Sequence, residues 1–390
     1  MSYSFRLYRG RIATGFGRTP VDYWRRRLYH SPPMSALSIY AGPTALKRIQ
    51  SEDLHADQFK VLVGAGGGPK WFVLFGLDRY LYGEFFATRS EALYTLGSSA
   101  GAWRMCCLAI SDPVGAIERL ANLYSQERYS DIPTVAEITE SARGILLGVL
   151  GMNGIQQIVE NPIFRTHILA ARCKGLGSSN NKLAQKFMLG SSAIANGVSR
   201  KSLSLFFQRT VFSNMGELSP WSALDDIDTH CVSLSEENLF DAMMASGAIP
   251  FVLEGIRDIA GAQRGLYWDG GIVDYHFDRM FNAGNDLVLY PHFSDVIIPG
   301  WFDKHVPWRN IHEENFHNVV LVTPSPEWVS SLPGQKIPDR QDFALFDNDP
   351  RIARFQEAPD KSNYLAEEFA ELVERGVGID RIQPLVNRPR

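Results

Sequence analysis

Residues 92–102 read Ala-Leu-Tyr-Thr-Leu-Gly-Ser-Ser-Ala-Gly-Ala, so a short apolar run leads into a serine flanked by small residues. The run 92–96 predicts a strand, and the mostly apolar residues 99–110 predict a helix directly after it. Ser99 is the central residue of a Gly-x-Ser-x-Gly pattern between Gly97 and Gly101, with Ser98 and Ala100 as its other small members. A serine at such a sharp strand-to-helix turn is typical of a nucleophile elbow. A plain helix start capped by Ser98 or Ser99 is the alternative.

On either side of this turn, the chain alternates between strand and helix patterns. Short apolar runs predict strands at 59–63, 92–96, 166–171, 203–207, 265–268, 286–290 and 318–322. Helical patterns fall at 71–86, 99–110, 181–197, 236–245 and 361–375. This alternation predicts an α/β fold with a mostly parallel central sheet and helices on both faces. We expect one large domain over 50–330, with a C-terminal tail and helix over 331–390 packed on it.

A glycine-rich turn follows the predicted strand 59–63 and reads Gly64-Ala65-Gly66-Gly67-Gly68-Pro69-Lys70. It lacks the third glycine of a dinucleotide-binding fingerprint and the Gly-Lys-Ser/Thr of a phosphate-binding loop. Consecutive glycines can expose backbone N–H groups, and Pro69 suits the first position of a helix. Bare amides at a helix start can hold an anion. An ordinary strand-to-helix turn is the alternative.

An aspartate ends the predicted strand 265–268, in the sequence Trp268-Asp269-Gly270-Gly271. Asp269 could take a proton from a serine directly if burial and a fixed hydrogen bond make its carboxylate basic enough. The same four residues also suit a common turn at a strand end. In addition, His276 and His292 follow Asp269, so a Ser–Asp–His triad is an open alternative.

Together these patches resemble the patatin-like phospholipase family. That family has a glycine-rich loop ending in Lys or Arg, then Gly-x-Ser-x-Gly, then Asp-Gly-Gly or Asp-Gly-Ala well downstream. A fourth patch, Ala-Ser-Gly-Ala-Ile-Pro-Phe at 245–251, is similar to the family's Ala-Ser-x-Ala-x-Pro segment. The resemblance covers about 58–280. The sequence departs from the family pattern at two places. Trp71 stands where the family usually has a glycine after the basic residue of the loop, and residues 272–277 lack the asparagine and proline that often follow Asp-Gly-Gly.

The resemblance implies a three-layer patatin-like architecture and hydrolysis of carboxylic esters of phospholipids or lysophospholipids by a Ser–Asp dyad. Ser99 would be the nucleophile and Asp269 the base, and neither a metal nor an organic cofactor would be needed. The resemblance also implies an oxyanion hole formed by the glycine loop and supporting residues around both catalytic groups. These residues are Gly66, Gly67 and Gly68 for the oxyanion hole, and Lys70, Gly270 and Gly271 in support. A generic esterase, an acyltransferase on the same dyad and a non-catalytic lipid- or protein-binding member of the fold are the alternatives.

The composition and the net charge limit the classes of partner that the protein can be expected to bind. The 390 residues carry a formal net charge of −4, which gives no support to nucleic-acid binding. His312 and His317 stand five residues apart rather than four, so no zinc motif is indicated.

No run of about 18 apolar residues occurs, and 144–159 is interpreted as a buried or interfacial helix. We expect a cytoplasmic protein with a lipid or ester substrate and peripheral membrane contact, while the oligomeric state stays open. The stretch 296–302, with Trp308 after it, is a candidate for that contact, although core or loop packing is the favoured interpretation.

The first 33 residues differ from the rest, because they hold seven arginines and one acidic residue, Asp22. We expect a basic N-terminal extension that is disordered. A start of the natural chain at Met34 and a targeting segment are the alternatives.

Overall fold

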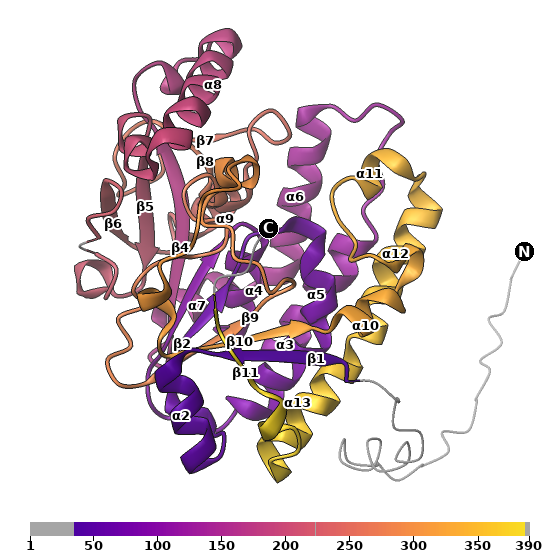
Figure 1. The fold of residues 1–390 in the computed structure, drawn as a ribbon. Helices are drawn as coiled ribbons and strands as arrows, with labels where there is room; N and C mark the ends of the chain where they lie inside the picture. Colours follow the sequence, from indigo (N-terminus) through magenta and orange to yellow (C-terminus); the bar gives the residue numbers. More distant parts are fainter. Residues whose placement is uncertain (1–34, 223, 387–390) are drawn as a thin grey trace, which may run out of the picture. The chain divides into compact units, whose positions relative to one another are not determined.

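The computed structural model describes residues 35–222 and 224–386. The predicted basic extension 1–33 therefore lies outside the described residues. Every described helix and strand belongs to one compact unit that begins at Ala36 (Figure 1).

The described part of the chain forms an 11-stranded sheet whose main order is β11-β1-β10-β9-β2-β3-β4-β5-β6. The strands are β1 (Leu37–Ala41), β2 (Phe59–Gly64), β3 (Leu93–Ser98), β4 (Phe164–Cys173), β5 (Phe207–Ser213), β6 (Thr229–Ser233), β7 (Ile256–Arg257), β8 (Leu266–Asp269), β9 (Leu287–Pro291), β10 (Val319–Pro324) and β11 (Gln383–Pro384). The central strands β10, β9, β2, β3 and β4 pair in parallel, and β8 pairs antiparallel with β4. The predicted mostly parallel sheet is confirmed.

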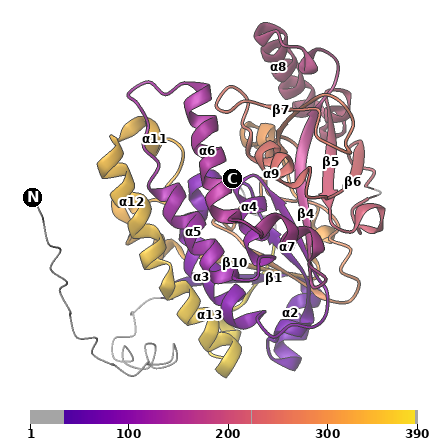
Figure 2. The ribbon, with the colours of Figure 1, turned by 180° about the vertical axis from the view of Figure 1, so that it is seen from behind.

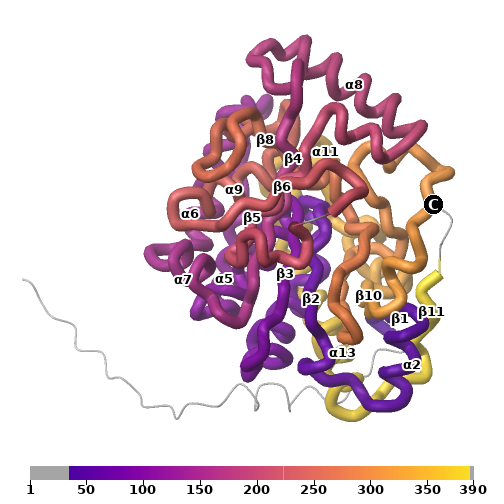
Figure 3. The backbone as a smooth tube through the Cα atoms, turned by 90° about the vertical axis from the view of Figure 1, so that its left-hand side faces the viewer, coloured from indigo at the N-terminus to yellow at the C-terminus, as the bar shows by residue number. Residues whose placement is uncertain are grey.

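Helices cover both faces of this sheet, as expected for a parallel sheet with buried strands. They are α2 (Pro43–Glu52), α3 (Phe75–Tyr80), α4 (Ala100–Leu108), α5 (Pro113–Ser125), α6 (Val135–Leu150), α7 (Gly154–Glu160), α8 (Lys182–Val198), α9 (Leu239–Gly247), α10 (Pro326–Ser330), α11 (Asp342–Leu345), α12 (Asn348–Lys361) and α13 (Asn363–Arg375). Figure 3 shows α5, α6 and α7 on one side of β2 and α2 on the other. None of the helices in residues 35–222 and 224–386 is both long and apolar enough to cross a membrane.

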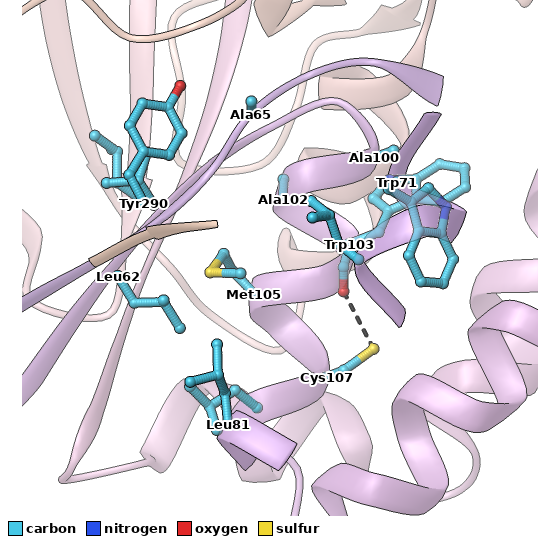
Figure 4. Close-up of a cluster of buried hydrophobic side chains, with 14 of the residues drawn as sticks. Leu62, Ala65, Trp71, Leu81, Ala100, Ala102, Trp103, Met105, Cys107 and Tyr290 are labelled. Atoms are coloured by element: carbon cyan, nitrogen blue, oxygen red, sulfur yellow. Dashed lines mark hydrogen bonds between the residues drawn. The ribbon is translucent and has the colours of Figure 1, made fainter. Parts of the chain in front are cut away.

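The core is centred on α4, the helix that follows the serine turn. All nine of its residues are buried, because the helix lies between the sheet and the outer helices. Figure 4 shows Met105 of α4 near Leu62 of β2, while the Cys107 thiol donates to the Trp103 carbonyl oxygen within the same helix. A helix surrounded by packed side chains has little freedom to shift, so the serine turn at its start is held firmly.

Two predicted elements are wrong. Residues 203–207 were expected as a strand, but Arg200–Leu205 is a 3-10 helix and β5 begins only at Phe207. Lys174 Nζ donates to the Ser204 carbonyl oxygen at 2.7 Å, so that carbonyl has a side-chain partner instead of a strand partner. Residues 144–159 do not form one helix, because Gly151 adopts a φ of +56° and separates α6 from α7.

The sheet extends beyond the predicted domain limits at residues 50 and 330. β1 pairs with β10, and β11 in turn pairs with β1. The segment after residue 330 contributes α11, α12 and α13, and α13 packs on α3. The boundary near residue 50 was placed too late because one five-residue strand and one short helix gave no clear periodic pattern.

The segment 296–302, a candidate for lipid contact, packs within the protein. Ile297 is buried, and the backbone of Tyr275 and His276 donates to the carbonyl oxygens of Pro299 and Ile298 at 2.8 and 3.0 Å. Trp308, which was named with this segment as a candidate for membrane contact, is exposed. The segment thus braces the residues that follow Asp269.

Candidate active site

The pairing of three strands brings Ser99 and Asp269 together. β3 pairs in parallel with the first part of β4, and its last residue, Ser98, lies opposite Leu169. β8 pairs antiparallel with β4 further along, and its last residue, Asp269, lies opposite Ala170. β5 occupies the other edge of β4 over this stretch, so β3 and β8 share one edge and run toward each other. The residue after β3 therefore lies beside the end of β8.

The backbone at Ser99 is sharply turned. Its φ of 55° and ψ of −135° lie in a region that residues with a Cβ rarely adopt. A Cβ on Gly101 would lie 2.0 Å from the Gly64 carbonyl oxygen, and one on Gly97 would lie 2.4 Å from Ala102 Cα. The turn is packed so closely against β2 and α4 that glycine is required at both flanking positions.

A buried serine supports this turn. The Ser99 backbone N–H donates to Ser246 Oγ at 2.9 Å, and Ser246 Oγ donates to the Leu169 carbonyl oxygen at 2.6 Å. Ser246 is fully buried at the end of α9, within the predicted Ala-Ser-x-Ala patch. The patch therefore has a defined structural role, which is to tie the Ser99 backbone to β4.

The Ser99 and Asp269 side chains form a direct hydrogen bond. Ser99 Oγ donates to Asp269 Oδ2 at 2.8 Å, and the Gly271 N–H donates to Asp269 Oδ1 at 2.7 Å. Only 6% of Ser99 and 7% of Asp269 is exposed. Burial raises the pKa of Asp269, while the Ser99 hydrogen bond and the Arg340 charge oppose that rise. A more basic carboxylate is a better acceptor for the serine proton.

The glycine loop lies next to the serine. A Cβ on Gly66 would be 3.3 Å from Ser99 Cβ. The Gly66 N–H donates to the Tyr275 carbonyl oxygen at 2.9 Å, so the Gly66 amide is already engaged, contrary to its expected place in the oxyanion hole. Within the described chain, the amides of Gly67 and Gly68 donate no hydrogen bond. These two amides remain the oxyanion donors that we propose.

Neither candidate histidine reaches the pair. His276 Nδ1 accepts from the Ile298 N–H at 3.0 Å, and His292 Nδ1 accepts from the Ser294 N–H at 2.9 Å. Both rings are buried, and burial lowers the pKa of His292 to about 3. Because Asp269 uses its two oxygens for Ser99 and Gly271, the geometry favours a dyad over a triad.

Two cationic side chains, Lys304 and Arg340, lie near Asp269, and Lys70 lies near both of them. Lys70 Nζ lies 5.2 Å from the centre of the Phe293 ring, and Lys304 Nζ lies 3.8 Å from that of Tyr275. Burial, together with the charges of Arg340 and Lys70, lowers the pKa of Lys304 to about 7. Arg340 comes from the C-terminal segment, and its guanidinium lies close to Gly68 and to Asp269.

Ser99 opens into a pocket of about 830 Å³. Part of the pocket lining is apolar and comes from α4, α6, the 249–253 segment and α11, with Trp103, Ile138, Ala142, Ile145, Ile249, Val252, Leu253 and Phe343. The lining also contains charged side chains of both signs, among them Arg340 and Glu127. Burial raises the pKa of Glu127 to about 7. The pocket therefore suits a molecule with both an apolar chain and a polar end.

Two of the site residues, Lys304 and Arg340, have no signal in the sequence. They stand far from every glycine motif and within no periodic pattern. Ser246 could be located through its motif, although its role could not. Among the described residues, His, Cys, Asp and Glu side chains form no group of three or more that could hold a metal ion.

The described chain is thus an α/β protein with a mostly parallel sheet and a buried, hydrogen-bonded Ser–Asp pair at a strand-to-helix turn. The sequence model of the patatin-like phospholipase family matches residues 62–276, more than half of the chain. The protein belongs to that family, and the predicted resemblance is confirmed. The family is one of lipid hydrolases.

Among solved structures, the similarity that we find to this chain is distant. The chain shares 15% identity with VipD from Legionella pneumophila, whose crystal structure aligns over 69% of this chain with a TM-score of 0.29. The chain spans about half of that protein, 55% of its length. No curated protein sequence matches this chain.

Proposed function

We propose that this protein is a lipid acyl hydrolase with Ser99 as nucleophile and Asp269 as the sole general base. The observation that carries the proposal is the 2.8 Å hydrogen bond from Ser99 Oγ to Asp269 Oδ2, at a turn that opens into the pocket. Asp269 takes the serine proton while Oγ attacks the ester carbonyl carbon. The bond to the alcohol oxygen then breaks, and the leaving alcohol takes that proton from Asp269.

Water completes the cycle by the same route. Asp269 takes a proton from a water molecule, whose oxygen attacks the acyl carbon on Ser99. The bond to Oγ breaks, Ser99 regains its proton from Asp269, and the fatty acid leaves. In both halves, the Gly67 and Gly68 amides would hold the negative oxygen of the tetrahedral intermediate. Loss of one such donor typically costs about 3 kcal/mol of transition-state stabilisation.

The pocket supports a phospholipid or lysophospholipid as substrate. Its apolar lining residues offer room for an acyl chain, and Arg340, with Lys304 in its protonated form, supplies positive charge beside the dyad. A negatively charged phosphate near the scissile ester would be attracted to these groups. The four cysteines are all free, which fits a reducing compartment, and we place the protein in the cytoplasm with peripheral contact to membranes.

Covalent labelling with a fluorophosphonate tests the nucleophile. Wild-type protein and Ser98→Ala should label, and Ser99→Ala should not. Ser98 is a matched control because it is the neighbouring buried serine, and its hydroxyl has no hydrogen-bond partner within the described chain. Labelling that survives in Ser99→Ala, or that is lost equally in both variants, would contradict the assignment.

Product analysis separates the enzymatic alternatives. With a phospholipid as acyl donor, a hydrolase releases free fatty acid at a rate that an added alcohol acceptor changes little. An acyltransferase forms the new ester instead, and a non-catalytic member neither labels nor turns over. Each of the last two results would replace the proposed activity.

The cationic side chains are tested by comparing headgroups. Arg340→Gln should raise KM for an anionic lysophospholipid by about tenfold and leave KM for a neutral short-chain ester nearly unchanged, because it removes one charge from the lining of the pocket. An equal effect on both substrates would show that Arg340 supports the dyad instead of recognising a charged headgroup.

A further inference from the structure

Helix α8 carries an apolar stripe on its outer face. Its large apolar side chains Leu183, Phe187, Ile194 and Val198 are 76, 69, 77 and 87% exposed. With 3.6 residues per turn, the four lie within about 60° of one another around the helix axis. Lone exposed apolar residues are ordinary on a protein surface, but here four lie on one face of a helix, in two pairs with the exposed Gly190 between them.

The buried face of α8 is mostly polar, which reverses the usual arrangement of a surface helix. Asn196 Nδ2 donates to Asp303 Oδ1 at 2.7 Å, and Gln185 Nε2 donates to the Ser179 carbonyl oxygen at 2.7 Å. Ser192 is also fully buried, with Met188 as the apolar member of this face. The helix is thus held to the protein by hydrogen bonds, and its apolar side faces outward.

The surroundings of the stripe are apolar and basic. Trp308 is 67% exposed, and its indole N–H donates to the Gly197 carbonyl oxygen at 3.3 Å, so its ring extends the stripe. The sequence contains no acidic residue between Glu160 and Glu217. Three exposed lysines lie beside the stripe, namely Lys182, Lys186 and Lys201. The Lys186 Nζ lies 5.6 Å from the centre of the Phe251 ring.

We propose that α8 lies on the surface of an anionic lipid bilayer, with its apolar stripe in the acyl–headgroup boundary and its lysines at the lipid phosphates. An amphipathic helix with lysines beside a large apolar face is typical of such interfacial binding. Anionic lipids would supply the negative charge that this region of the protein lacks. A second copy packed stripe to stripe would not, because α8 and its flanks contain no acid to pair with the lysines.

This orientation would present the pocket to the lipid. Figures 1 and 2, which differ by half a turn about the vertical axis, both show α8 at the upper end of the molecule, where α11 and the start of α6 also lie. Ile138 of α6 and Phe343 of α11 line the pocket, and Leu345 of α11 is exposed. Binding through α8 would therefore bring α11 and the start of α6, which line the pocket, toward the bilayer.

Vesicle sedimentation tests the proposal in the full chain. All proteins carry Ser99→Ala, so that lipid is not consumed and binding is measured apart from the proposed catalysis. Vesicles of mixed phosphatidylcholine and phosphatidylglycerol should bind Phe187→Asn/Ile194→Asn at least about tenfold more weakly than the parent, because two of the four apolar anchors are lost. Met152→Asn is the matched control, since Met152 is 99% exposed at the turn after α6 and away from the stripe.

Charge and assembly complete the test. Lys182→Gln/Lys186→Gln should weaken binding at low salt and much less at high salt. The arginines of residues 1–33 are present in every protein and cancel in each comparison. Equal vesicle binding by the stripe variant and the parent would overturn the proposal. So would a parent that is a dimer in solution and becomes a monomer in the stripe variant, because a second copy would then cover α8.

Discussion

At the scale of single residues, the site depends on how the Ser99 backbone is held. Its φ of 55° is unfavourable for a residue with a Cβ, and its N–H is buried. Ser246 Oγ accepts a hydrogen bond from that N–H and donates one to the Leu169 carbonyl oxygen of β4. Ser246 therefore acts as a positioning residue for the proposed nucleophile.

Ser246→Ala should lower kcat about tenfold with little change in KM. The substitution leaves the Ser99 N–H without a partner, which costs about 1–3 kcal/mol and loosens the turn. Steady-state kinetics and the rate of fluorophosphonate labelling measure the effect. Ser98→Ala, which removes a buried hydroxyl with no partner in the described chain, should leave both rates near those of the wild type. An unchanged kcat in Ser246→Ala would refute the positioning role.

Asp269→Asn should lower the acylation rate by several orders of magnitude without lowering Tm at neutral pH. Burial raises the pKa of Asp269, so the folded protein binds more protons than the unfolded chain between the ordinary and the raised pKa. Stability from this group therefore falls as pH rises through that window, and a neutral side chain of the same shape removes the penalty. Thermal unfolding and labelling kinetics check both parts.

The same shift predicts the acid limb of the pH profile of kcat/KM. Activity should fall as pH falls through the raised pKa, at a higher pH than an ordinary aspartate would give. His276→Gln and His292→Gln should remain within about tenfold of the wild type, because neither ring contacts Ser99 or Asp269. If either histidine variant loses as much activity as Asp269→Asn, a triad replaces the dyad.

At the scale of elements, the helix after the serine turn contains one charged residue, Arg104, which is buried. Its guanidinium makes two 2.7 Å hydrogen bonds to the Asp78 carboxylate of α3. This ion pair joins α3 to α4 and so links the outer helices to the serine turn. A buried pair of this kind is costly to break from one side.

Arg104→Ala should destabilise the protein by about 3–5 kcal/mol, because it leaves the Asp78 carboxylate buried and unpaired. Burial raises the pKa of Asp78 and Arg104 lowers it, so without Arg104 the carboxyl takes up a proton more easily. The loss should therefore be larger at pH 8 than at pH 5, as measured by urea unfolding. Asp78→Leu/Arg104→Met should recover most of the stability; a double variant as unstable as the single one would contradict this account.

Local patterns explain which elements could be predicted. β2, β3 and α4 are long apolar runs bounded by glycines, and the structure has them close to the expected limits. Residues 203–207, Leu-Ser-Leu-Phe-Phe, have a similar apolar content, yet a lysine from a distant turn donates to the Ser204 carbonyl oxygen and Arg200–Leu205 forms a 3-10 helix. Sequence periodicity contains no information about such a partner.

At the scale of the whole molecule, the site draws on parts of the chain that the motifs do not mark. Arg340 reaches the dyad from the C-terminal segment, which also supplies α12, α13 and β11 to the same unit. The four motif patches could be ordered along the sequence, and the strands they follow could be predicted. That β3 and β8 end side by side on β4 depends on sheet pairing, which local sequence does not encode.

Deletion of residues 1–33 should leave hydrolysis of a soluble short-chain ester unchanged. The compact unit begins at Ala36, and β1 begins at Leu37, whose N–H donates to Glu368 Oε2 at 3.0 Å. Every residue of the candidate site lies beyond β1. Binding to anionic vesicles should weaken after the deletion, because each basic residue near such a surface contributes about 1 kcal/mol, and the difference should shrink at high salt. Vesicles of neutral lipid are the control and should bind both proteins equally, because they offer no net negative charge to residues 1–33. A deletion protein that is unfolded, or inactive on the soluble ester, would place these residues within the folded domain.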